Sequence, residues 1–159
     1  MTNGVYVIIL TLKNILIYIL LMKNIFHGFS WHGVKNILMN FSELKDKIIT
    51  QIELSEYEII FHTIDADADA EIRDKYKLYH ENDCCEEVYV ESIVGNISDI
   101  IGTPIVVAEE SSNSLETDIT SCTWTFYKID TIKGGITIRW IGTSNGYYSE
   151  SVDFVRMEN

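Results

Sequence analysis

Residues 57–63 read YEIIFHT, and residues 73–80 read RDKYKLYH. The first stretch is rich in aromatic and β-branched residues, which favour strands. The second alternates apolar with charged side chains, and Tyr76 and Leu78 share one face. The acidic residues 65–69 between them indicate a solvated turn, because they lack the glycine and the glutamate of a calcium loop. We therefore predict a β-hairpin at this point of the chain.

The same signals extend outward from the hairpin. Alternating segments bounded by turn residues predict further strands at 48–54, 87–93, 104–109, 124–130, 135–141 and 151–157. Short helical turns are predicted at 41–47 and 98–101, and a polar loop at 110–121. The fold class that follows is mainly β or α+β. It is an antiparallel, strongly curled sheet or a small barrel-like domain with one or two short helices.

The chain divides into an apolar extension, residues 1–40, and a single acidic β-rich domain, residues 41–159. Residues 5–26 are apolar, but Lys13 and Asn14 interrupt them, and a central lysine costs about 2.5–3.5 kcal/mol in a bilayer. Three interpretations remain open for this extension. It is a membrane anchor, a packed helix, or translated upstream DNA with Met39 as the true start.

Charge and cysteine content narrow the class of protein. The net charge is −12, and residues 1–40 hold three lysines and no acid, so the remaining 119 residues carry −15. Such an acidic body repels phosphate backbones, which excludes direct nucleic-acid binding and leaves nucleic-acid mimicry open. Three cysteines do not form a disulfide framework. We expect a cytoplasmic protein in a host cell, with membrane anchoring as the alternative.

Residues 80–87, HENDCCEE, form the first candidate site, with His80, Asp83, Cys84 and Glu86 as candidate ligand-binding residues. Zinc ligation and a thiol nucleophile with His80 as its base are the chemical alternatives. Adjacent cysteines on a strand point to opposite faces, and nearby acids raise a thiol pKa, so both alternatives are disfavoured. We assign no catalytic residue, no metal ligand and no cofactor. The remaining interpretations are a structural corner and a ligand pocket.

Residues 144–149, SNGYYS, form the second candidate site. Asn145 followed by glycine is a hairpin turn signal. Of the adjacent Tyr147 and Tyr148, one is expected to be buried and one exposed, and exposed tyrosine suits recognition. Arg139 needs an acidic partner or an anionic ligand on its central strand. These four residues complete the candidate ligand-binding set.

Several motifs together resemble a small uncharacterised domain family of phages and bacteria that carries an Asp-Cys-Cys core. They are HENDCCE (80–86), VYVESI (88–93), IGTPI (101–105), AEE (108–110), TWTFY (123–127), IRW (138–140) and SNGYYS (144–149). The resemblance covers roughly residues 44–157. Asn82 departs from it, since glutamine is expected there. The resemblance implies a phage or prophage setting and transfers no activity.

The sequence favours a non-catalytic accessory protein of phage or viral type. It is expected to bind a small polar ligand or a host protein through the segments near His80 and Tyr147. One alternative is a thiol- or metal-dependent hydrolase that uses the loop from His80 to Cys84. The other is an acidic nucleic-acid mimic. A homo-oligomer is left open.

Overall fold

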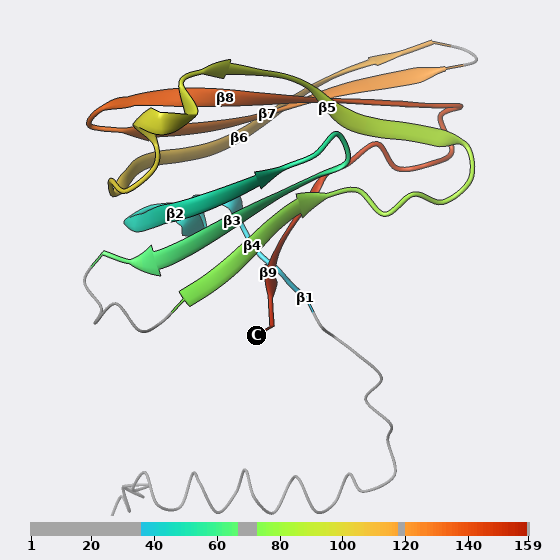
Figure 1. Cartoon of the computed structure of the whole chain (residues 1–159). Helices are drawn as coiled ribbons and strands as arrows, with labels where there is room; N and C mark the ends of the chain where they lie inside the picture. Colours follow the sequence, from blue (N-terminus) through green and yellow to red (C-terminus); the bar gives the residue numbers. More distant parts are fainter. Residues whose placement is uncertain (1–35, 67–72, 118–119, 159) are drawn as a thin grey trace, which may run out of the picture. The chain divides into compact units, whose positions relative to one another are not determined.

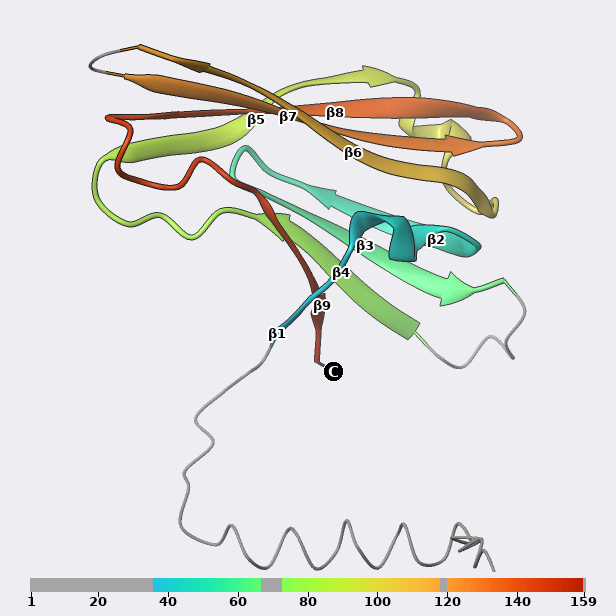
Figure 2. The ribbon, with the colours of Figure 1, turned by 180° about the vertical axis from the view of Figure 1, so that it is seen from behind.

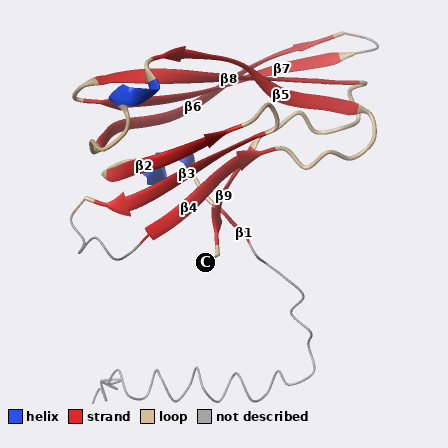
Figure 3. Cartoon of the chain, viewed as in Figure 1, coloured by secondary structure: helices blue, strands red, loops and turns tan. Residues whose placement is uncertain are grey.

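The described residues form two antiparallel sheets that lie one over the other (Figures 1 and 3). The computed structural model describes residues 36–66, 73–117 and 120–158, which belong to one compact unit. Its strands are β1 (Asn36–Leu38), β2 (Lys47–Leu54), β3 (Glu58–Asp65), β4 (Arg73–Tyr79), β5 (Glu86–Gly95), β6 (Ile105–Glu116), β7 (Ser121–Thr131), β8 (Gly134–Ser144) and β9 (Asp153–Met157). Two 3-10 helices, η1 (Phe41–Leu44) and η2 (Ile97–Asp99), complete the described elements.

The first sheet has the order β1-β9-β4-β3-β2. The predicted hairpin is its centre, because β3 pairs with β4 and Phe61 lies opposite Tyr76. Alternate side chains of both strands point inward, and Phe61 and Leu78 are fully buried. The alternation seen in the sequence therefore marks the face that is turned to the core.

The second sheet has the order β5-β8-β7-β6, so that each of its strands runs against its neighbour. Tyr127 of β7 and Trp140 of β8 are fully buried between the two sheets. Phe41 of η1 joins the layers, since its ring lies 4.7 Å from that of Tyr127 and 5.2 Å from that of Phe154 on β9. Burying each such side chain stabilises the fold by about 1.5–3 kcal/mol.

The mainly β, antiparallel fold with two short helices is confirmed. Of the two architectures expected for it, the barrel is not formed, because β5 and β6 remain open edges of the second sheet in the described part of the chain. Backbone pairing between the layers is sparse in the described part of the chain: isolated bridges join Ile48 to Pro104 and Ile49 to Ile101, and the Val90 N–H bonds to the Glu56 carbonyl oxygen. The two layers make a sandwich, in which side chains rather than backbone pairing hold the sheets together.

Two local expectations were wrong. The predicted loop at 110–121 is mostly strand, since β6 continues to Glu116 and pairs with β7 along its whole length. The predicted hairpin turn at Asn145 is not one, because β8 and β9 belong to different sheets. Helical turns do form at both predicted places, but they are shorter than expected, and each is capped by a preceding asparagine, Asn40 or Asn96.

Among the described elements, the chain crosses between the sheets twice, both times at the same end of the sandwich (Figures 1 and 2). Residues 80–85 lead from β4 up to β5, and residues 145–152 lead from β8 back down to β9. The two polar segments singled out in the sequence are these two crossings. The fold therefore places them at the same end.

The expectations for residues 1–35 and for most of the acidic turn at 65–69 lie outside the described residues. Of that turn, Asp65 is described, and its carboxylate pairs with Lys47. Within the described ranges, no helix has the length and apolar character needed to cross a bilayer.

Candidate functional site

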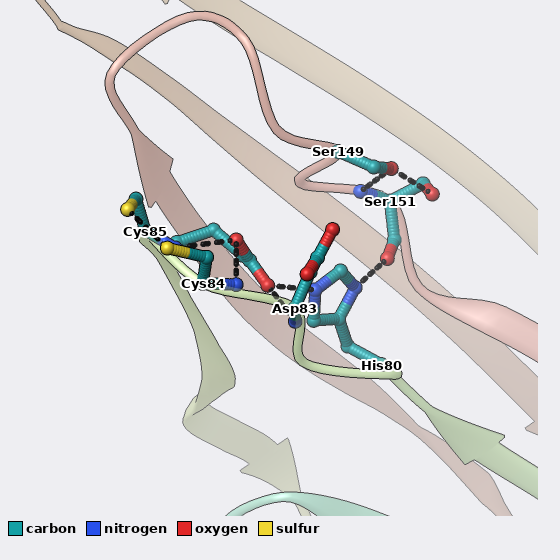
Figure 4. A network of polar contacts seen from close by, with 7 residues as sticks. His80, Asp83, Cys84, Cys85, Ser149 and Ser151 are labelled. Atoms are coloured by element: carbon teal, nitrogen blue, oxygen red, sulfur yellow. Dashed lines mark hydrogen bonds and ion pairs between the residues drawn. The ribbon is translucent and has the colours of Figure 1, made fainter.

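The two crossings are held side by side by a hydrogen bond between residues far apart in the sequence. His80 Nδ1 lies 2.8 Å from the backbone carbonyl oxygen of Ser151, to which it donates (Figure 4). His80 Nε2 lies 3.6 Å from Glu86 Oε1, which is within range of an ion pair. The imidazole therefore links the two crossings, and the side chain of His80 is only 7% exposed.

Glu86 organises the first crossing. Its carboxylate accepts hydrogen bonds from the backbone N–H groups of Asp83, Cys84 and Cys85, the last two at 3.3 and 3.0 Å. Hydrogen bonds from consecutive amides form a concave site for an anion, here filled by the protein's own side chain. The backbone N–H of Asp83 is the main cause that lowers the pKa of Glu86, which His80 lowers further. Glu86 is therefore ionised at neutral pH, with a side chain only 1% exposed.

The two adjacent thiols face each other, contrary to the expectation that they point to opposite faces. The Sγ atoms of Cys84 and Cys85 lie 2.7 Å apart (Figure 4). Strand alternation does not apply here, because the two residues form a bend and β5 begins only at Glu86. Both cysteines are exposed and unpaired. The pKa of the Cys85 thiol is raised, chiefly by its hydrogen bond with Cys84.

The second crossing presents its two tyrosines differently, as expected. Tyr147 is 92% exposed, whereas Tyr148 is half-buried and hydrogen-bonds with the thiol of Cys84. That bond, with the nearby cysteine charges, raises the pKa of Tyr148 to about 12. Asn145 Oδ1 accepts from the backbone N–H of Tyr147 at 3.1 Å, and Gly146 adopts a φ of +84°. Asn145 therefore shapes the turn that exposes Tyr147.

A polar groove of about 360 Å³ lies beside the second crossing. Its floor is the inner face of the second sheet beyond the core, where hydroxyls follow Tyr127 on alternate positions of β7. Hydroxyl groups and carboxylates dominate its lining, which comprises Glu110, Ser112, Glu116, Ser121, Thr123, Thr125, Gly146, Tyr148, Ser149, Glu150, Ser151 and Val152. The described residues that line it include no lysine, arginine or histidine.

Glu150 lies in the wall of this groove and is 8% exposed. Its carboxylate accepts a hydrogen bond from the Ser121 hydroxyl. Burial raises the pKa of Glu150, but hydrogen bonds from Ser121, Thr123 and Ser144 outweigh it and lower the pKa overall. The salt bridges formed among the described residues do not include Glu150. Hydroxyl groups thus satisfy this buried negative charge, and the described residues supply no ion pair that neutralises it.

A family model described as a domain of unknown function, DUF7448, matches residues 42–154. The chain belongs to the DUF7448 family. No curated protein and no solved structure matches it. The resemblance to an uncharacterised domain family is thereby confirmed at that level, and it covers nearly the same residues as expected.

The DUF7448 domain brings together most of the sequence-predicted residues, but not Arg139. His80, Asp83, Cys84, Glu86 and Tyr148 meet where the crossings touch, with Asn145 and Tyr147 in the adjoining turn. Arg139 instead lies on the outer face of β8, where its guanidinium pairs with Glu91. Within the described ranges, no group of three or more histidine, cysteine or acidic side chains is placed to hold a metal ion.

Sequence reasoning named Tyr148 but missed the groove residues that β6 and β7 of the DUF7448 domain contribute. Glu110, Ser112 and Glu116 fall in the segment predicted as a loop. Their signal was a polar alternation that continues the inward positions of β6 beyond Ala108, matched by Ser121 and Thr123 on β7. Alternation without apolar residues does not register as a strand in a hydrophobicity pattern.

Proposed function

We propose that the protein is a non-catalytic accessory protein of phage or viral type that binds a small, polar, positively charged ligand in the groove beside the second crossing. The observation that carries the proposal is the lining of this groove, which offers hydroxyl groups and three carboxylates and no cationic side chain among the described residues. Hydroxyl groups and carboxylates accept hydrogen bonds, so the complementary ligand is a donor such as an amine.

The electrostatics of the groove favour a cation over a neutral ligand. Glu150 is ionised and buried without a cationic partner in the described salt bridges, and burial raises the pKa of Glu110. A carboxylate in this condition gains from a positive charge placed nearby, because the charge replaces the water that was removed. The net charge of −12 also attracts cations over longer distances.

The phage or viral setting and a cytoplasmic location belong to this proposal. The resemblance carried by the DCC and SNGYYS motifs supports the setting. Three unpaired cysteines support a reducing compartment.

Titration with spermidine, followed by backbone amide NMR, tests the proposal. Spermidine is expected to shift the amides of residues 110–112, 121–125 and 146–151. Glu110→Gln should weaken binding several-fold, because it removes one of the groove charges. Glu109→Gln is the matched control, since Glu109 is exposed on the other face of β6. Equal weakening by both variants, or no localised shifts, would overturn the proposal, as would tighter binding of a neutral disaccharide.

A host protein remains the second candidate, because Tyr147 is 92% exposed at the edge of the groove. A lysine side chain of such a partner offers the same charged amine as spermidine. A lysine-containing peptide therefore serves as the second probe. Tyr147→Ala should weaken binding of the peptide and leave spermidine unaffected if the partner is a protein. Equal affinities of the wild type and the Tyr147→Ala variant for the peptide would remove this candidate.

A further inference from the structure

The thiols of Cys84 and Cys85 form a pair that the groove does not explain. Their Sγ atoms are 2.7 Å apart and both residues are exposed (Figure 4). A disulfide bond is about 2.05 Å long, so the two sulfur atoms need only a small movement to bond. Because the cysteines are consecutive, such a bond would join neighbouring residues.

The backbone beneath the pair is fixed in place. The buried Glu86 carboxylate holds the N–H groups of both cysteines, and His80 braces the same segment against Ser151. The sulfur atoms therefore have little freedom other than rotation of their own side chains. This arrangement keeps the thiols together at the surface instead of allowing them to point apart along a strand.

A bond between neighbouring cysteines is reversible by its nature. Consecutive Cα atoms are about 3.8 Å apart, whereas Cα atoms joined by an ordinary disulfide are about 4.4–6.8 Å apart. The closed ring is therefore strained, and strained, exposed disulfides are readily reduced. Such a bond suits regulation more than structural support.

We propose that Cys84 and Cys85 are a redox modification site that takes a low-molecular-weight disulfide, such as oxidised glutathione, and closes into a bond between the two residues. One thiolate attacks a sulfur atom of the glutathione disulfide and releases one glutathione thiol. The other cysteine then attacks the mixed disulfide and releases the second glutathione. Two protein thiols are oxidised, two glutathione thiols are formed, and each departing thiolate takes up a proton that the protein loses.

Formation of the disulfide would affect the groove through Tyr148. The Tyr148 hydroxyl hydrogen-bonds with the Cys84 thiol, and the same side chain lines the groove. This contact raises the pKa of Tyr148, so the tyrosine hydroxyl donates and the sulfur accepts. A disulfide sulfur cannot ionise, so oxidation leaves a weaker acceptor for the hydroxyl. The redox state of the pair is thus coupled to the position of a groove residue, although the chemistry of the pair does not depend on what the groove binds.

Incubation with oxidised glutathione, followed by intact-mass analysis, tests the redox site. Cys122 borders the same hollow as Cys85, so the experiment uses the Cys122→Ser variant, which leaves only the pair. This variant should lose two hydrogens, keep no glutathione and have no thiol left for alkylation. Adding Cys84→Ser or Cys85→Ser should trap one glutathione on the protein, because no second thiol remains to release it.

Two results would overturn the inference. The first is that the Cys122→Ser variant, which keeps both cysteines of the pair, retains as much glutathione as the variants that lack one of them. The second is oxidation that yields only disulfide-linked dimers on a non-reducing gel. Tyr148 provides a second readout, because oxidation should lower its raised pKa towards that of an ordinary tyrosine. An absorbance titration measures this change. An unchanged titration in protein of the oxidised mass would show that the pair and the groove are not coupled.

Discussion

At the scale of single residues, the polar side chains of this site have two roles, and burial distinguishes them. His80 and Glu86 are almost completely buried and hold the first crossing in shape. Cys84 and Cys85 are exposed on that crossing, and Tyr147 is exposed on the second one. The sequence places all of these polar groups within two short segments, and burial separates those that hold the backbone from those that are free to react or bind.

The thiol of Cys84 should suppress the reactivity of Cys85. Cys84→Ala removes the hydrogen bond that chiefly raises the pKa of Cys85, so the Cys85 pKa should fall towards that of a free thiol. A larger thiolate fraction makes alkylation by iodoacetamide several-fold faster at neutral pH. The rate is measured in the Cys122→Ser background, with a cysteine-containing peptide as the reference. A slower reaction in the Cys84→Ala variant would contradict a hydrogen bond between the two thiols.

At the scale of secondary structure, sequence alternation predicted the strands that have one buried face. The hairpin of β3 and β4 was found because Phe61 and Leu78 face the core. The outer half of β6 was missed because its residues are exposed on both faces, so pairing with β7 rather than burial keeps it extended. The contact of His80 with Ser151 joins positions 71 residues apart, which no local pattern can predict.

The packing of the second crossing on β8 depends on Gly142. A Cβ added at Gly142 would lie 2.7 Å from Glu150 Cβ and 2.9 Å from the Glu150 carbonyl oxygen. Gly142→Ala should therefore displace Glu150 and lower the free energy of unfolding by about 1–3 kcal/mol. Urea denaturation measures the change. Thr143→Ala, at the neighbouring exposed position, should change it by less than about 0.5 kcal/mol. Equal stability of the two variants would show that the crossing does not rest on β8.

At the scale of the whole molecule, the topology concentrates the polar chemistry at one end of the sandwich. Both crossings between the sheets lie there, together with the part of the second sheet whose inner face is polar. The rest of the space between the sheets is filled by the apolar core, which is built around Phe41, Tyr127 and Trp140. The stability of this domain should therefore respond to pH through carboxylates at that end, which differ in the direction of their pKa shifts.

Glu150 and Glu110 should affect the acid stability of the domain in opposite directions. The folded-state pKa of Glu150 is lowered by its hydroxyl donors, so its contribution is present above the ordinary glutamate pKa of about 4.3 and is lost as pH falls through the lower value. Glu110 is exposed as a whole, but the groove shields its carboxyl group from part of the solvent and so raises its pKa. Ionised Glu110 therefore opposes folding at neutral pH, and this cost disappears as pH falls through the raised value. The two groups thus act in adjacent pH windows.

Urea denaturation of the wild-type, Glu150→Gln and Glu110→Gln proteins, from about pH 7 to about pH 3, separates these effects. Glu150→Gln should be less stable than the wild type at neutral pH, and the difference should close below the ordinary glutamate pKa. Glu110→Gln should instead be more stable at neutral pH and converge on the wild type at a higher pH. Parallel curves for all three proteins would mean that neither carboxylate is coupled to folding. The buried charge in the groove wall would then be solvated in practice, and the reason to expect a cationic ligand would be lost with it.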